Sequence, residues 1–248
     1  MINYKDHFEM KYSAIYILAA LIVILSGCEK TGEAYKEYLQ TGEIYYPGRI
    51  DSLSLLTGNL RGRIRFKMTS DPKVTRLKAF VRNSLSPDEV QIDIPVQPNE
   101  YGSVKQVDLP NLKETSYSIS IRSYSAANDS SRAVAASQFI YGPNYNSALS
   151  NRIFSAFRLS GAKDSILFKP EINLPKPGIF YIMQLTEIVY TNTGNGMDTV
   201  RITPYENRVA LPGIKNPSVV QYRTAFMPIE NCIDLFYTPF IELLYSKP

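Results

Sequence analysis

Hydrophobic and polar residues alternate along most of the chain after residue 45. In residues 61–70, for example, Ile64, Phe66 and Met68 occupy every second position. A period of two is typical of a β-strand with one buried face, whereas an amphipathic helix repeats its apolar positions every three or four residues. Similar short runs lie at residues 77–81, 90–94, 104–109, 117–124 and 134–141. The pattern predicts about seven strands up to residue 141 and no helix of useful length.

Turn-forming residues interrupt the pattern at Gly142, Pro143 and Asn144, and a second series of runs follows. These runs lie at residues 153–159, 165–169, 180–191, 199–203, 208–211, 219–226 and 232–245, with a proline-rich turn after the second of them. Strand runs separated in this way are typical of β-sandwiches. We therefore predict an all-β fold, with two tandem immunoglobulin/fibronectin type III-like β-sandwiches at residues 44–141 and 142–248.

A short pattern recurs in both series and supports two related domains. Residues 107–116 read VDLPNLKETS, and residues 209–218 read VALPGIKNPS without a gap. Repetition at a domain-length period indicates a duplicated unit. Val220, Tyr222 and Phe226 have the spacing of a core face after the second copy. We therefore expect the buried face there to be shifted by one residue relative to the first copy.

The segment from Leu112 to Tyr117 resembles the tyrosine corner of fibronectin type III domains. In that motif a leucine leads into a turn, the tyrosine begins the next strand, and its hydroxyl bonds to the backbone upstream. The resemblance implies structural roles for Leu112 and Tyr117. Val219 stands where Tyr117 would fall in the second copy, so we expect the second sandwich to lack this corner.

The beginning of the chain has the layout of an export signal. Residues 12–26 form one apolar run of about fifteen residues, shorter than the roughly 20 that a membrane-spanning helix needs, and Lys11 precedes it. A start at Met10 would give a more basic leader, because acidic residues precede it. The run ends in LSGC at residues 25–28, which resembles the bacterial lipobox and points to Cys28 as the lipidated residue.

The lipobox resemblance implies a lipid-anchored protein. The signal peptide would comprise residues 1–27, and the polar residues 28–43 would form a tether. More than one acyl chain on Cys28 gives a stable membrane anchor, where a single chain binds only marginally. We therefore expect a cell-envelope protein anchored at the outer membrane, on either its periplasmic face or the cell surface.

Composition excludes several classes of function. The single histidine, His7, lies in the predicted signal peptide, which excludes Ser-His-Asp triads, Cys-His pairs and the usual zinc sites from the mature chain. We expect no cofactor and no metal. The net charge of +4 is mild and unclustered, so nucleic-acid binding is not expected. Cys232 has no partner once Cys28 is lipidated, and its alternating surroundings place it in the core.

Aromatic residues near the boundary between the two series are the candidate ligand contacts. Tyr141 and Tyr145 flank the turn, and Asn144 lies between them as a polar neighbour. Tyrosine rings can stack on a sugar while their hydroxyls bind polar groups. Packing in the core is the alternative, and it explains most tyrosines of a sandwich.

Acidic residues in the second half are the candidates for catalysis. A glycosidase needs two carboxyl groups about 5–10 Å apart, one of them with a raised pKa. Solvated turn and strand-edge positions are the commoner explanation for such residues, and we expect no enzyme. The candidates are Asp164, Glu171, Glu187 and Asp198.

Four segments resemble a lipoprotein family of unknown function from Bacteroidota. They are residues 37–49 (EYLQTGEIYYPGR), 70–74 (SDPKV), 186–190 (TEIVY) and 233–238 (IDLFYT). Together they span most of the mature chain, but no known chemistry attaches to them. Where the resemblance leads us to expect tryptophan on the early strands, this chain has Phe66 and Phe80, which we expect in the core.

These observations favour a non-catalytic binding or adhesion module. Its ligand would be a glycan or a partner protein of the envelope, although sandwiches host many functions and the fold alone does not choose between them. The alternative is a structural spacer or an assembly subunit of an envelope complex. The least favoured hypothesis is a glycan-active enzyme that uses carboxylates alone.

Overall fold

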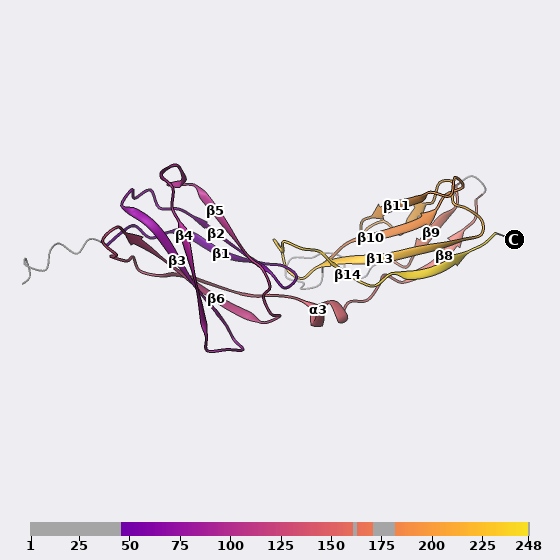
Figure 1. Ribbon diagram of the computed structural model, residues 1–248. Coiled ribbons are helices and arrows are strands. Elements are labelled where there is room, and N and C mark those ends of the chain that lie inside the picture. The colour runs from indigo at the N-terminus through magenta and orange to yellow at the C-terminus, as the bar shows by residue number, and fades with distance from the viewer. Residues whose placement is uncertain (1–45, 161–162, 171–181, 248) are drawn as a thin grey trace, which may run out of the picture. The chain divides into compact units, whose positions relative to one another are not determined.

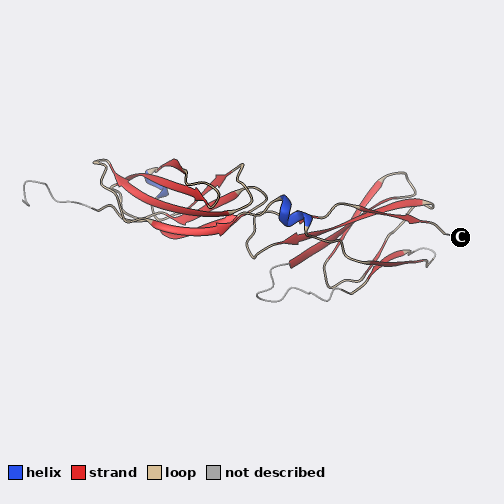
Figure 2. Ribbon diagram, turned by 90° about the horizontal axis from the view of Figure 1, so that it is seen from below, coloured by secondary structure: helices blue, strands red, loops and turns tan. Residues whose placement is uncertain are grey.

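The computed structural model describes residues 46–160, 163–170 and 182–247, apart from the side chain of Ile182. The predicted signal peptide, the tether and Cys28 lie outside these ranges, as do Glu171 and most of the proline-rich turn. Pro47–Pro248 form one compact unit. Within it the strands gather into two β-sandwiches, with a short helix between them in the chain (Figure 1, Figure 2).

The first sandwich consists of two antiparallel sheets. Its strands are β1 (Asp51–Thr57), β2 (Gly62–Lys67), β3 (Val74–Asn83), β4 (Glu89–Pro95), β5 (Val104–Leu109), β6 (Ser116–Ser125) and β7 (Val134–Phe139). One sheet has the order β1-β2-β5 and the other the order β4-β3-β6-β7. The 3-10 turn η1 (Pro98–Glu100) precedes β5. The chain crosses between the sheets after β2, β4 and β5, which gives the strand order of a fibronectin type III domain.

The second sandwich repeats this arrangement. Its strands are β8 (Phe154–Arg158), β9 (Ser165–Phe168), β10 (Ile182–Thr191), β11 (Met197–Ile202), β12 (Arg208–Ala210), β13 (Ser218–Met227), β14 (Phe236–Tyr237) and β15 (Ile241–Tyr245). One sheet has the order β12-β9-β8, and the other has the order β11-β10-β13-β14, with β15 also paired to β13. The all-β fold of two tandem sandwiches is therefore as the sequence pattern predicted.

Each sandwich buries the alternate positions of its strands. In the first, Ile64, Leu77 and Ile119 are fully buried in one cluster that draws on both sheets. Burying such a side chain stabilises the fold by about 1.5–3 kcal/mol. The second core is richer in tyrosine. The hydroxyl of Tyr222 donates to the Arg152 carbonyl at 2.9 Å, which satisfies a polar group that burial would otherwise penalise.

The repeated sequence pattern occupies the same place in both sandwiches. Residues 107–116 lead from β5 into β6, and residues 209–218 lead from β12 into β13. Tyr117 of β6 is buried, but its counterpart Val219 is exposed while Val220 and Tyr222 are buried. The predicted shift of the buried face by one residue is therefore present in β13.

The last predicted run, residues 232–245, is not a single strand. It forms β14 and β15, which both pair with β13. Pro239 lies between them and has no N–H to donate to a strand ladder. At this break the Thr238 hydroxyl accepts the backbone N–H of Thr224 at 2.9 Å, so a side chain replaces a backbone acceptor.

Phe66 lies in the core as expected, but Phe80 does not. Leu77, Ala79 and Val81 take the buried positions of β3. Because side chains alternate across a strand, Phe80 points away from the core and is half-buried on the outward face of the sheet. The expectation that Phe80 is a core residue was therefore wrong.

A short helix, α3 (Pro143–Ser147), follows β7 and was not expected from the sequence. The domain boundary expected between residues 141 and 142 lies between β7 and β8, immediately before this helix. Pro143 suits the first turn of a helix, where the missing N–H has no partner to lose. Among the helices in the described ranges, none combines the length and the apolar composition needed to cross a membrane.

Candidate functional site

The outward face of the sheet β4-β3-β6-β7 carries a regular grid of side chains around Phe80. Residues opposite one another on antiparallel strands point to the same side of the sheet. Phe80 of β3 lies opposite Gln91 of β4 and Ser120 of β6. The two flanking rows, read from β4 to β6, are Glu89-Arg82-Ser118 and Asp93-Lys78-Arg122.

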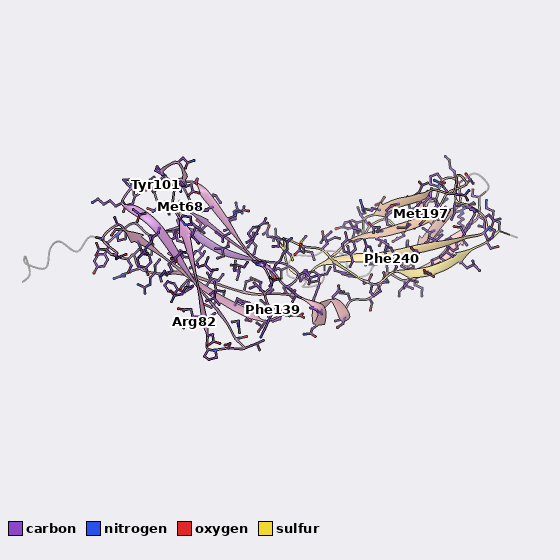
Figure 3. The ribbon with its side chains drawn as sticks, viewed as in Figure 1. Met68, Arg82, Tyr101, Phe139, Met197 and Phe240 are labelled. Carbon is purple, nitrogen blue, oxygen red and sulfur yellow. The ribbon has the colours of Figure 1, made fainter. Side chains whose placement is uncertain are left out.

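A hollow with a volume of about 320 Å³ opens on this face beside Phe80. Its size is at the lower end of the range for ligand pockets, about 300–1,000 Å³. It forms because the residues beside the Phe80 ring on β6 are serines, and Ala133, which immediately precedes β7, is also small. These small side chains leave the ring uncovered. Arg82, which is labelled in Figure 3, is among the residues that line it. The lining residues are Phe80, Arg82, Glu89, Ser118, Ser120, Arg122 and Ala133.

Basic side chains outnumber acidic ones on this face. Arg82 Nε lies 2.6 Å from Glu89 Oε2, so this arginine is paired within the protein. Lys78 Nζ is 3.9 Å from Asp93 Oδ1, a weak ion pair. Arg122 is exposed, and within the described ranges its side chain makes neither a hydrogen bond nor an ion pair. The rim of the hollow therefore offers an uncompensated positive charge.

The three ligand residues expected from the sequence lie together near α3. Tyr141 makes edge-to-face ring contacts with Phe139 and Tyr145, with centroids 5.1 and 5.0 Å apart. Tyr145 makes a similar contact with Phe236 at 5.0 Å. These rings pack against one another, while Asn144 is exposed. Phe139, at the end of β7, is labelled in Figure 3.

Glu114 fixes the start of α3. Its carboxylate accepts the backbone N–H of Asn144 at 2.7 Å and that of Tyr145 at 2.8 Å, two donors that a helix start leaves without an internal partner. A second hollow of about 320 Å³ lies nearby. Pro143 and Asn146 of α3 line it, whereas none of the three expected residues does. Its other lining residues are Asn59, Leu235, Phe236 and Tyr237.

Asp164 is held in a buried network. The Tyr245 hydroxyl donates to Asp164 Oδ2 at 2.6 Å, and the Lys247 ammonium lies 2.5 Å from the same oxygen. The backbone N–H of Ser160 donates to Oδ1 at 2.9 Å. The hydrogen bonds from Lys247 and Tyr245 lower the pKa of Asp164 to about 2. Asp164 is therefore an ionised structural anchor and not a proton donor.

Glu187 is buried on the outward face of the second sandwich, between two arginines. Arg201 Nε and Arg223 Nε donate to its two carboxylate oxygens at 2.9 and 2.8 Å. Burial raises the pKa of Glu187, but the two guanidinium groups outweigh it and hold the pKa below its ordinary value. Arg223 also lies over the ring of Phe240, which is labelled in Figure 3, at 4.6 Å.

Asp164 and Glu187 lack the raised pKa expected of a glycosidase acid. That acid requires a raised pKa, whereas the pKa values of Asp164 and Glu187 are both lowered. Asp198 lies on β11, opposite Tyr190 of β10. Glu171 lies outside the described residues. In the described part of the chain, no three His, Cys, Asp or Glu side chains are grouped to hold a metal ion.

The Tyr117 hydroxyl has the geometry of a tyrosine corner. It accepts the backbone N–H of Lys113 at 2.9 Å, and Leu112 packs against the first core cluster. In the second sandwich, the hydroxyl of Tyr190 on β10 donates to the Pro212 carbonyl at 3.1 Å. A tyrosine from a different strand thus holds the matching connection, which the sequence comparison did not reveal.

Cys232 is buried and forms no disulfide. Burial raises the pKa of its thiol, so the reactive thiolate is suppressed near neutral pH. This cysteine is a packing residue, as expected from its alternating surroundings.

Sequence reasoning missed Phe80 and Arg122 as candidate site residues. A large apolar residue by itself reads as core, but the alternation of Leu77, Ala79 and Val81 already placed Phe80 on the other side of β3. Arg122 follows the buried Ile121 in the same way on β6. The alternation of apolar residues along β3 and β6 therefore already indicated that both side chains lie on the outward face of the sheet.

A family model described as a domain of unknown function matches residues 28–236. No curated protein matches the sequence.

Three chicken proteins are among the solved structures that are similar to the chain. A segment of two fibronectin type III domains from tenascin is 12% identical over 81% of this chain and 100% of its own, with a TM-score of 0.34. The first three fibronectin domains of CNTN1 are 9% identical over 81% and 67%, with a TM-score of 0.44. The interferon gamma receptor alpha chain is 10% identical over 81% and 99%, with a TM-score of 0.34.

Proposed function

The chain belongs to the DUF4998 family of domains of unknown function, and from its surface we propose that it is a non-catalytic module that binds glycans beside Phe80. The observation that carries the proposal is the half-buried ring of Phe80 in a hollow of about 320 Å³. An aromatic ring left open on a sheet face offers an apolar platform for the C–H face of a sugar. Polar groups at its edge can bind the sugar hydroxyls.

The proposal includes a lipid tether. The apolar run at residues 12–26 and the LSGC sequence that ends it support cleavage before Cys28 and lipid attachment at that residue. The family match begins at residue 28 and leaves the apolar run out. A tethered module on the cell envelope would present its sandwiches to extracellular or periplasmic glycans.

A glycan array tests the proposal directly. The probe is the chain of residues 29–248, which retains every described residue. We expect binding that Phe80→Ala removes and that Tyr205→Ala leaves unchanged, because Tyr205 is an exposed aromatic elsewhere (63% exposed). A blank array with protein shown to be folded by circular dichroism would overturn the proposal.

The same array separates the two candidate surfaces. Tyr141→Ala and Tyr145→Ala would abolish binding if the ligand sits near α3, as the sequence alone suggested. In that case Phe80→Ala would leave binding intact, and the location on the first sandwich would be wrong. Because Tyr141 and Tyr145 pack against neighbouring rings, their variants also need a thermal unfolding measurement.

A structural role is the second candidate. The observation in its favour is that residues of the two sandwiches bond to each other directly. The Ile233 N–H donates to the Thr57 carbonyl at 2.8 Å, and Arg61 pairs with Asp234. A spacer or assembly subunit would use such contacts to hold its domains. This candidate would gain support if no glycan bound and an envelope partner was recovered instead.

A further inference from the structure

We propose that the ligand beside Phe80 is an anionic oligosaccharide, a sugar chain that bears carboxylate or sulfate groups, and that Arg122 binds its charge. The inference rests on the proposed function and narrows the class of glycan. It follows from three properties of the hollow: the charge at its rim, its aromatic floor and its free hydroxyl groups.

The charge at the rim is positive and only partly compensated. On β4, β3 and β6 this face carries four basic residues and two acidic ones. The basic residues are Arg76, Lys78, Arg82 and Arg122, and the acidic residues are Glu89 and Asp93. Both acidic residues lie on β4, at one edge of the sheet, where they meet Arg82 and Lys78.

Among the described residues, no carboxylate forms an ion pair with the other two basic residues. Arg76 donates to the amide oxygen of Asn128 at 2.6 Å, and its guanidinium lies over the Tyr124 ring at 4.9 Å. Both partners are neutral, so the positive charge of Arg76 remains. Arg122 is unpaired among the residues that the structure describes. The β6 side of the face is therefore the side that attracts an anion.

Arg122 is the residue placed to bind an anionic group. It is exposed, lines the hollow and lies opposite Lys78, one row away from Phe80. A guanidinium offers a planar fork of donors that matches a carboxylate or sulfate in a bidentate fashion. Lys78 can add charge from the neighbouring strand, because its pair with Asp93 is long at 3.9 Å.

The floor of the hollow favours a sugar over other anions. A bare phosphate or sulfate ion would gain nothing from the ring of Phe80, whereas a sugar ring can lie against it. Ser118 and Ser120 point to the same side, and within the described ranges their hydroxyls have no hydrogen-bond partner. Each can donate to and accept from a sugar hydroxyl. The Phe80 ring, the two serine hydroxyls and the Arg122 guanidinium together match a sugar that bears an acidic substituent.

An acidic peptide is the competing class of ligand. A peptide binds a sheet most readily by adding a strand to an open edge, where backbone groups are free. The hollow instead lies on the face of the sheet, over β3 and β6, whose backbones are paired on both sides. This position favours a ligand recognised through its rings and substituents.

The test is titration calorimetry with matched acidic and neutral sugars, using residues 29–248. The probes are oligogalacturonate with its methyl-esterified form, and chondroitin sulfate with desulfated chondroitin whose carboxyl groups are methyl-esterified, so that one member of each pair is neutral. We expect at least one acidic probe to bind, and its affinity to fall about tenfold when its charge is removed or when Arg122 is changed to Gln. Raising the salt from 50 to 500 mM should weaken binding, since exposed charges are screened.

The control variant is Arg132→Gln. Arg132 is another exposed arginine near the sheet, but it does not line the hollow. Equal losses in Arg122→Gln and Arg132→Gln would mean general charge attraction and would overturn the inference.

The outcomes separate this inference from the proposed function. If neutral and charged sugars bind alike, and Phe80→Ala abolishes binding while Arg122→Gln does not, the anionic ligand is wrong and the glycan module stands. If no sugar of either kind binds to folded protein, both are wrong. If an acidic peptide such as poly-glutamate binds and the acidic sugars do not, the ligand class is wrong.

Discussion

The carboxylate of Asp234 receives a two-pronged hydrogen bond from the guanidinium of Arg61, from Nε at 2.8 Å and from Nη2 at 2.5 Å. It also accepts the backbone N–H of Asn59 at 2.9 Å. Arg61 precedes β2 of the first sandwich, and Asp234 precedes β14 of the second. The hydrogen bonds from Arg61 lower the pKa of Asp234. One ion pair thus joins residues that are far apart in the chain.

Replacing Asp234 with alanine should destabilise the protein. The change removes three acceptor contacts from a side chain that is only 20% exposed and leaves the Asn59 N–H without its acceptor. We expect a loss of about 2 kcal/mol in the free energy of unfolding, measured by urea denaturation at pH 7.

Asp108→Ala is the matched control for this experiment. Asp108 also accepts two hydrogen bonds from one arginine, Arg63, but its side chain is 62% exposed. An exposed pair of this kind contributes little, so we expect no measurable change. Equal losses in the two variants would contradict the importance of burial at Asp234.

The hydroxyl of Tyr117 should stabilise the first sandwich. Tyr117→Phe keeps the buried ring but removes the acceptor of the Lys113 N–H, which is bonded at 2.9 Å. We expect the unfolding free energy to fall by about 1 kcal/mol. Tyr205→Phe, at an exposed position, should have no effect. If the two variants were equally stable, the corner would have no energetic role.

Much of the fold could be read from the sequence because one-sided burial imposes a period of two. The buried positions Ile64, Phe66 and Met68 are the ones that the alternation identified. The break at Pro239 was also present in the sequence, but the apolar residues around it read as one strand. The hydrogen bond from Thr224 to the Thr238 hydroxyl depends on pairing with β13, which no local pattern reveals.

The candidate site was less readable, because it depends on the register between strands. Ser120 lies beside Phe80 only because β6 pairs with β3 in one particular register. The uncompensated charge of Arg122 likewise depends on which strand carries the acidic residues. Tyr141 and Tyr145 are close in sequence, so their proximity was predictable. Their packing against Phe236 was not, since that residue comes from β14.

Lipid attachment should depend on Cys28 alone. In cells fed a labelled fatty acid, Cys28→Ala should abolish incorporation of the label and release the protein from the membrane fraction, because the thiol is the proposed acceptor. Cys232→Ala is the matched control, since Cys232 is buried in the second sandwich. Labelling that survives Cys28→Ala, or is lost in Cys232→Ala, would contradict the lipobox interpretation.

Asp164 should make stability depend on acid pH. Its pKa is lowered from 3.8 to about 2 by the hydrogen bonds from Lys247 and Tyr245. A carboxyl group whose pKa is lower in the folded state stabilises that state at pH values above its unfolded pKa. This contribution is therefore complete above roughly pH 5 and is lost as the pH falls through the interval between 3.8 and about 2.

Asp164→Asn isolates this contribution from those of the other carboxyl groups. We expect the variant to be less stable than the wild type at pH 7, with a difference in urea midpoint that shrinks as the pH falls towards 2. Tyr245→Phe removes one donor and keeps the carboxylate and the Lys247 pair, so its pH-dependent loss should be smaller. A difference between Asp164→Asn and wild type that stays constant from pH 7 to pH 2.5 would mean that Asp164 acts through packing and not through its charge.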